Sequence, residues 1–341
     1  MHAISAADSV SLAIQRTREL LFRPFNWGTY LKLGLVAIIT EGIGGHLQSS
    51  THGGPPGHGP IINSPFDIPP VWIAAAVAAV LLAILLCLVI FYLITRLRFA
   101  FFHCLIHNTS EIRPGWWLYR AQANRFFWLN LGVGFCYLLL LALVSLPFVA
   151  GFIRLFHETL PGGHPDLGLL LALVLPLIPV IFLLVLVGVM ADVVLRDWML
   201  PHFALEDATA GEAWEEVWDR IKADTRQFIV YALLRLILPA IAMIGLFIVL
   251  IIPGLMLAGS VAAIEYGIHS VFADATGAAA LVGVLLEVFF GVVAFGFALL
   301  AGICLGGPVS TGVREYALIF YGGRYQVLGD ILYPPPPPLV V

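Results

Sequence analysis

Long apolar segments dominate this chain and alternate with shorter polar ones. A transmembrane helix needs about 20 consecutive apolar residues to cross the roughly 30 Å hydrocarbon core of a bilayer. The pattern therefore predicts an all-α, polytopic transmembrane helix bundle within a single integral membrane domain over residues 1–333. We predict six spans, which are Trp27–Gly44, Val71–Thr95, Phe127–Phe152, Leu167–Leu195, Phe228–Ile252 and Ala278–Gly306.

The apolar segment that contains the fifth span continues to Ile264. It is too long for one straight crossing at about 1.5 Å per residue. We expect Pro239 to kink this helix and Pro253-Gly254 to end it. Leu255–Ile264 would then form a half-helix that lies in, or re-enters, the membrane interface. A seventh span is the alternative.

Three polar segments that precede spans have helical periodicity. In residues 209–226, Thr209 and Glu212 match a capping box, and Trp214 and Trp218 belong to an apolar stripe of helical period. Residues 5–22 and, more weakly, 113–124 have the same pattern. We predict amphipathic helices at the cytoplasmic interface of the bilayer, where tryptophan is favoured.

Similar tripeptides end each of these segments and open the next span. Arg23-Pro-Phe25, Arg125-Phe-Phe127 and Arg226-Gln-Phe228 lie 102 and 101 residues apart. This spacing predicts a three-fold internal repeat with units of about 5–107, 108–208 and 209–309. The alternative is that any regular alternation of two spans with one interfacial helix produces similar spacing.

Two segments are low in complexity. Residues 45–70 are rich in Gly, Pro and His and predict a flexible outer loop, whereas residues 334–341 form a polyproline tail.

Composition narrows the class of protein further. Of 341 residues, 60% are hydrophobic and 11% are charged, which excludes an ordinary soluble enzyme. The net charge is −4 and no basic stripe is present, so we expect no nucleic-acid partner. In the six-span topology, 14 of the 17 Lys and Arg residues fall on one side. Positive residues stay cytoplasmic, so both termini are predicted to be cytoplasmic.

One stretch of the chain carries a family resemblance. The residues that carry it are Pro201-His-Phe-Ala-Leu205-Glu206, Glu212-Ala213, Trp218, Phe228 and Tyr231-Ala-Leu-Leu-Arg-Leu. The stretch resembles the membrane domain of some bacterial glycerophosphodiester phosphodiesterases and of many uncharacterised bacterial multi-span proteins. The resemblance implies a fold and a bacterial inner membrane. It implies no activity, because the phosphodiesterase chemistry of that family resides in a separate soluble barrel for which this chain has no room.

Charged residues inside apolar spans are costly and are therefore candidate functional residues. Arg235 and Glu287 are both predicted near the membrane midplane, within reach of each other. They would form either a substrate or proton site, or a buried ion pair that fixes helix register. Lys32 and Glu41 lie nearer span ends, where side chains can reach the interface. Asp192 and Arg196 are spaced as an i, i+4 ion pair, for which we favour a structural role.

Histidines offer two candidate metal sites. His103 and His107 are spaced to share one helix face, as two ligands of one ion require, and His202 has a comparable place after the fourth span. His46, His52 and His58 lie in the predicted outer loop. Ordinary interfacial or solvated histidine is the competing interpretation, so we assign no metal, cofactor or catalytic residue.

Two further patterns have structural interpretations. Glu215-Glu-Val-Trp-Asp-Arg220 and Phe99-Ala-Phe-Phe-His103 match strings of intramembrane CAAX-type proteases, but in reversed order and with the glutamates on a surface helix. We interpret this match as chance. Gly302-Ile-Cys-Leu-Gly306 forms a small-residue face suited to helix packing, for which we expect a partner within the chain.

These observations predict an integral inner-membrane protein without enzymatic activity. We expect a membrane scaffold, or a protein that interacts with lipids or partners. The expected partners are membrane lipids, and other membrane proteins or further copies of this chain. The alternative is a small-solute or lipid transporter that uses Glu287 and Arg235, and an intramembrane enzyme is the third interpretation.

Overall fold

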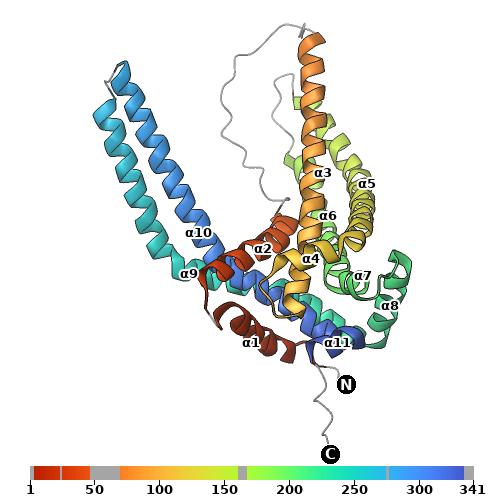
Figure 1. The fold of residues 1–341 in the computed structure, drawn as a ribbon. Helices are drawn as coiled ribbons and strands as arrows, with labels where there is room; N and C mark the ends of the chain where they lie inside the picture. Colours follow the sequence, from red (N-terminus) through yellow and green to blue (C-terminus); the bar gives the residue numbers. More distant parts are fainter. Residues whose placement is uncertain (1–3, 24, 47–69, 160–166, 274–275, 334–341) are drawn as a thin grey trace, which may run out of the picture. The chain divides into compact units, whose positions relative to one another are not determined.

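The computed structural model of this protein describes residues 4–23, 25–46, 70–159, 167–273 and 276–333. Over these residues the chain is almost entirely helical and contains no β-strand, which confirms the all-α prediction there. Figure 1 shows the helices in chain order. By their contacts, the residues divide into two compact units. Unit 1 comprises Met1–Gly44, Cys104–Ser110 and Arg226–Val341, and unit 2 comprises Gly45–His103 and Glu111–Thr225.

The helices of the described residues divide between the two units. Those that lie mainly in unit 1 are α1 (Asp8–Phe22), α2 (Trp27–His46), α9 (Thr225–Phe272), α10 (Ala278–Gly322) and α11 (Gln326–Leu332). Those that lie mainly in unit 2 are α3 (Pro70–Ile106), α4 (Ile112–Leu118), α5 (Arg120–Thr159), α6 (Leu167–Val193), the π-helix η1 (Val194–Met199), α7 (Leu200–Leu205) and α8 (Ala210–Ala223).

Five stretches of helix among the described residues are long and apolar enough to cross a membrane. The multi-pass prediction is therefore supported, but six spans are not confirmed. The first predicted span corresponds to α2, which is not among the five. The five stretches are Ile73–Ile106, Arg120–Leu155, Leu170–Leu205, Thr225–Phe272 and Ala278–Gly322.

The predicted break at Pro253-Gly254 is wrong, because α9 is one helix of 48 residues that contains both Pro239 and Pro253. Leu255–Ile264 is therefore neither a separate half-helix nor a seventh span. A proline removes one backbone hydrogen bond, whereas ending the helix in an apolar medium would leave several backbone groups without partners. Continuity is the less costly outcome.

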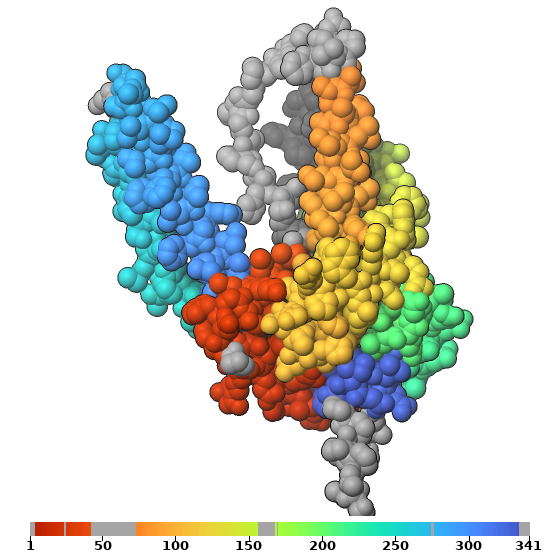
Figure 2. All heavy atoms as spheres, in the orientation of Figure 1, coloured from red at the N-terminus to blue at the C-terminus, as the bar shows by residue number. Residues whose placement is uncertain are grey.

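The long helices α9 and α10 form an antiparallel pair in unit 1. Their outer parts, next to Gly277, lie side by side (cyan and blue in Figure 2). A Cβ atom placed on Gly283 would lie 2.8 Å from Cβ of Phe272, which shows how closely the two helices approach there. In Figure 1 both helices change direction before their inner parts reach α1 and α11. There the ring of Tyr231 stacks on Phe320 at a centroid distance of 4.4 Å.

Helix α2 crosses α10 at a contact between two glycines. A Cβ atom on Gly307 would lie 2.7 Å from Cα of Gly34, so no larger residue fits without a backbone shift. Gly306 adjoins Ile38, whereas nothing lies within 4 Å of a Cβ placed on Gly302. The small-residue face predicted at Gly302–Gly306 therefore packs within the chain at only one of its two glycines.

Helix α1 is attached to α10 through a buried carboxylate. The side chain of Glu315 is 1% exposed, and its Oε2 lies 3.5 Å from Nε of Arg16. Nη2 of Arg16 also donates a hydrogen bond of 3.1 Å to the carbonyl of Leu105, at the end of α3. Because Arg16 holds both elements, α1 is fixed beside the ends of α3 and α10.

Unit 2 has an aromatic core where α3, α4 and α5 meet. Phe126 contacts Phe99 and Phe203 in edge-on geometry, at centroid distances of 5.5 and 5.3 Å. Gly115 of α4 lies so close to α3 that a Cβ atom there would be 2.7 Å from Cβ of His103. Further along the chain, Tyr137 of α5 donates a hydrogen bond of 3.1 Å to the carbonyl of Leu184 on α6.

The predicted amphipathic helices have different outcomes. Residues 5–22 correspond to α1, and residues 209–226 correspond to α8, whose capping box between Thr209 and Glu212 is confirmed. The hydrogen bonds from the backbone and hydroxyl of Thr209 hold the pKa of the Glu212 carboxyl below its usual value. Residues 113–124 instead divide between α4 and the start of α5.

The element order places a short helix before two longer ones three times: α1 before α2 and α3, α4 before α5 and α6, and α8 before α9 and α10. This order agrees with a three-fold repeat, which stays a prediction. The predicted outer loop 45–70 and the polyproline tail 334–341 fall almost wholly outside the described residues.

Candidate functional site

The structure does not bring Arg235 and Glu287 together. Nη2 of Arg235 lies 3.0 Å from Oε2 of Glu41 on α2, and these side chains are 11% and 8% exposed. Oε1 of Glu287 lies 3.3 Å from Nδ1 of His269 on α9. The predicted contact is thus replaced by two separate ones.

The continuity of α9 explains this difference. The prediction ended the fifth span at Ile252, whereas α9 continues to Phe272. The turn between α9 and α10 therefore moves along the chain, and Glu287 lies opposite His269. At about 1.5 Å per residue, roughly 50 Å of helix separates His269 from Arg235.

Asp192 and Arg196 form the ion pair that the sequence predicts, with Oδ2 and Nη1 3.2 Å apart. Arg196 is nearly buried, with 5% of its side chain exposed, whereas Asp192 is 40% exposed. The pair spans the junction between α6 and η1, so the backbone changes from α- to π-helical geometry within it. It stabilises that junction.

The predicted shared face of His103 and His107 is wrong. Helix α3 ends at Ile106, so His107 lies in the turn after it, where Asn108 has a positive φ of 51°. The ring of His103 instead packs against Tyr119 at a centroid distance of 5.9 Å. Of the other candidates, the His46 side chain, His52 and His58 lie outside what the structure describes.

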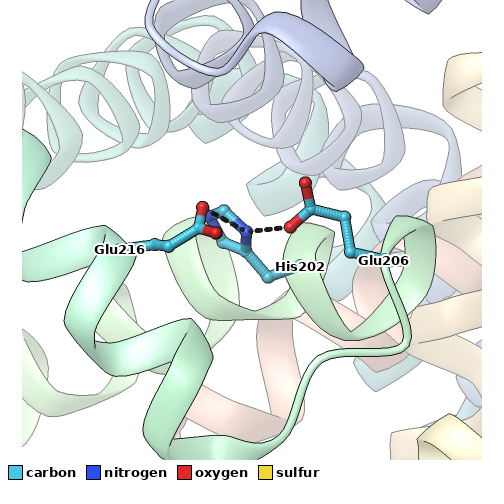
Figure 3. Close-up of side chains that lie close together, drawn as sticks. All are labelled: His202, Glu206 and Glu216. Atoms are coloured by element: carbon cyan, nitrogen blue, oxygen red, sulfur yellow. Dashed lines mark hydrogen bonds and ion pairs between the residues drawn. The ribbon is translucent and has the colours of Figure 1, made fainter.

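A different histidine has two carboxylates beside it. His202 on α7 is fully buried, and its Nδ1 lies 3.0 Å from Oε2 of Glu206 and 3.4 Å from Oε2 of Glu216 on α8 (Figure 3). Among the described residues, this is the group of His, Cys, Asp or Glu whose ligand atoms are close enough to share a metal ion. The remaining member of the cluster is Arg220, whose Nη1 lies 2.8 Å from Oε2 of Glu216.

The hydrogen bonds of this cluster are satisfied without a metal. Nη1 of Arg220 lies 3.4 Å from Nε2 of His202, which can accept a hydrogen bond only if it carries no proton. The proton of the ring is then on Nδ1, which donates a hydrogen bond to the carboxylate of Glu206. A metal on Nδ1 would move the proton to Nε2, where it would face the Arg220 donor. The geometry therefore favours a hydrogen-bonded clasp between α7 and α8 over a metal centre.

The sequence did not indicate two of the carboxylates that form contacts between helices. Glu216, beside His202, was placed on a solvent-facing side of its helix. Glu315, beside Arg16, lies beyond the predicted end of the sixth span at Gly306. The i, i+4 spacing of His202 and Glu206 was a visible signal for the clasp. No sequence rule pairs either residue with Glu216, because that contact depends on how α8 packs against α7.

The pair of Glu41 and Arg235 is expected to be important for stability. Replacing Glu41 with Gln removes the carboxylate charge beside the buried guanidinium of Arg235 and should lower the free energy of unfolding by about 3 kcal/mol. Thermal unfolding in detergent micelles measures the effect. The exchange Glu41→Arg with Arg235→Glu should recover part of the loss, and Glu287→Gln is the matched control. A loss in Glu287→Gln equal to that in Glu41→Gln would contradict this assignment.

The clasp makes a prediction about metal binding. We expect Zn²⁺ to leave the melting temperature of the wild-type protein unchanged, because Arg220 opposes the tautomer that a metal requires. His202→Ala should accelerate amide hydrogen exchange along α8, which then loses its polar attachment to α7. A Zn²⁺-dependent rise in the melting temperature that disappears in His202→Ala would establish a metal site instead.

Comparison with known proteins gives one match. No curated protein and no solved structure matches the chain. None of the comparisons links it to the membrane domain of glycerophosphodiester phosphodiesterases. The model of a family of unknown function, DUF7544, matches residues 4–331. The chain, which carries at least five helices able to cross a membrane, therefore belongs to the DUF7544 family.

Proposed function

We propose that this protein is a non-enzymatic multi-pass membrane protein that binds phospholipid at one surface of the membrane. The observation that carries the proposal is the exposed tryptophan pair of α8. The rings of Trp214 and Trp218 stack with centroids 5.8 Å apart, and the residues are 46% and 45% exposed. Indole rings favour the boundary between headgroups and acyl chains, where one side is apolar and the other is wet.

Other residues of α8 hold the helix in place and so fix the position of Trp214 and Trp218. Ala213 and Val217 are buried and attach the helix to unit 2, while Glu216 and Arg220 belong to the clasp with His202. The tryptophans lie on the flank between the buried side and the solvated side of the helix. Nζ of Lys222 lies 5.5 Å from the Trp218 ring, so a cation is present where a lipid phosphate would lie. This arrangement suits a helix that lies along a membrane surface.

Unit 1 has a comparable aromatic surface at the link between α1 and α2. Phe22, Phe25 and Trp27 are 44%, 47% and 62% exposed, and all three rings contact Tyr30. Arg18 precedes this segment in the sequence and Arg23 lies within it. Aromatic rings beside arginines are typical of the cytoplasmic membrane interface.

We further propose six crossings with both termini in the cytoplasm of a bacterial cell. The contact of Arg16 with Leu105 supports this topology, because it puts α1 and the end of α3 on one side. If α3 crosses the membrane, the chain between α1 and α3 must also cross it, and α2 is the described helix in that interval. The distribution of the basic residues supports the cytoplasmic assignment of that side.

This topology predicts that a reporter fused after Gly277 lies outside the cytoplasm. Gly277 is at the turn between α9 and α10, one crossing away from α11. Paired alkaline phosphatase and fluorescent-protein fusions at this site measure the side. Fusions after Leu332 are the control and should be cytoplasmic, whereas a cytoplasmic signal at both sites would contradict the six-crossing topology.

The transporter alternative now depends on different residues. Arg235 is paired with Glu41, and Glu287 lies beside His269 with 38% of its side chain exposed. Glu265 is one helical turn before His269 on α9. Titratable groups on an apolar helix pair favour a proton or solute path in this part of unit 1. Membrane scaffolding with bound lipid remains our main proposal, because the interfacial aromatic surfaces occur in both units.

The lipid-facing position of the tryptophan pair can be tested by fluorescence quenching. We expect phospholipids brominated near the headgroup end of the acyl chain to quench the reconstituted protein. The double variant Trp214→Phe/Trp218→Phe should show a smaller quenched fraction, because two of eight tryptophans are removed from the interface. Trp198→Phe is the matched control, since Trp198 is 4% exposed and its removal should raise the quenched fraction. An unchanged quenched fraction in the double variant would argue against interfacial lipid contact.

A further inference from the structure

We propose that a surface hollow of unit 2 binds the phosphate group of a membrane phospholipid. This inference rests on the lipid-binding function proposed above and assigns it a site. The hollow has a volume of about 510 Å³ and is lined by Tyr92 of α3, Trp117 and Leu118 of α4, and Arg120, Ala121 and Asn124 of α5. A hollow of this size is large enough for a lipid headgroup.

The polar side of the hollow is suited to an anion. Arg120 and Asn124 are one helical turn apart on α5, so their guanidinium and amide donors lie on the same side of the helix. Both residues are exposed, and no acidic residue lines the hollow. Arg120 is also the first residue of α5, a helix of 40 residues, so the positive end of the helix dipole lies at the hollow. A phosphate oxygen can therefore accept hydrogen bonds from a charged and a neutral donor.

The aromatic side of the hollow is held in place by Arg96. The guanidinium carbon of Arg96 lies 4.4 Å from the ring centroid of Trp116 and 5.6 Å from that of Trp117. Nη2 of Arg96 donates a hydrogen bond of 2.6 Å to the carbonyl of Trp116. These contacts fix α4 against α3 before any ligand is present, so little ordering is needed on binding.

An apolar path leads away from the hollow on both helices. On α3, Leu88 and Leu85 are exposed and precede Tyr92 by one and two turns. On α5, Trp128 and Phe135 are exposed, and nothing lies within 4 Å of a Cβ placed on the intervening Gly132. This surface can hold an acyl chain that begins at the hollow. A ligand with a phosphate at one end and acyl chains at the other fits both parts, whereas a soluble phosphate uses only the first.

Native mass spectrometry of the delipidated protein in detergent tests the site with three probes. These are phosphatidylglycerol, diacylglycerol with the same chains, and glycerol phosphate without chains. We expect phosphatidylglycerol to bind at concentrations where neither of the other two does. Arg120→Gln should weaken phosphatidylglycerol binding roughly tenfold, because one charge-assisted hydrogen bond is lost. Arg120→Lys keeps the charge and should have a smaller effect.

Arg113→Gln is the matched control, because Arg113 is an exposed arginine of α4 that does not line the hollow. It should bind phosphatidylglycerol within twofold of wild type, and all variants should retain the wild-type melting temperature. Equal binding by Arg120→Gln, Arg113→Gln and wild type would overturn this site while leaving the proposed function in place. Equal binding of glycerol phosphate would overturn the lipid assignment. Binding of neither phosphatidylglycerol nor diacylglycerol to the wild-type protein would overturn the proposed function itself.

Discussion

The continuity of α9 through Pro253 decides how α9 and α10 pair in unit 1. An apolar environment supplies no substitute partners for free N–H and C=O groups, so the helix tolerates the proline. The turn therefore falls next to Gly277, and the register between α9 and α10 follows from it. That register places His269 opposite Glu287 and brings Tyr231 against Phe320, which in turn puts α10 where α1 and α2 can pack on it.

Several charged residues in each unit pair with one another. Arg16 with Glu315, and Arg235 with Glu41, each join a different helix to the α9–α10 pair. His202, Glu216 and Arg220 do the same between α7 and α8. The Arg16–Glu315 and Glu41–Arg235 pairs are costly to break because each contains a buried charged side chain that would lose its charged neighbour. Because these charged residues already have partners within the chain, we assign them a structural role and base the proposed function on the exposed aromatic surfaces.

These interfacial surfaces combine aromatic rings with cations in three places. Lys222 lies over the ring of Trp218, which stacks on Trp214. The aromatic cluster around Tyr30 includes Phe22, which precedes Arg23 in the sequence, and the hollow lined by Arg120 is also lined by Trp117. Each combination matches a phospholipid, whose headgroup carries a phosphate and whose chains are apolar. The tight crossing of Gly34 and Gly307 and the bonds of Arg96 make the supporting helices rigid. Lipid binding therefore stays our proposal, and it is supported by features that recur in both units.

The sequence by itself determined the class of protein, the helical content and the local devices. Apolar run length predicts the spans, and spacing predicts the Thr209–Glu212 capping box and the Asp192–Arg196 pair, because these depend on neighbours within one or two turns. Only the tertiary structure decided the partners of Arg235, Glu287 and His202. Those contacts depend on where α9 ends and how α8 packs against α7. The sequence shows where a proline or an amphipathic stripe lies. Whether a helix continues through the proline depends on its apolar surroundings, and the contacts of the stripe depend on how distant helices pack.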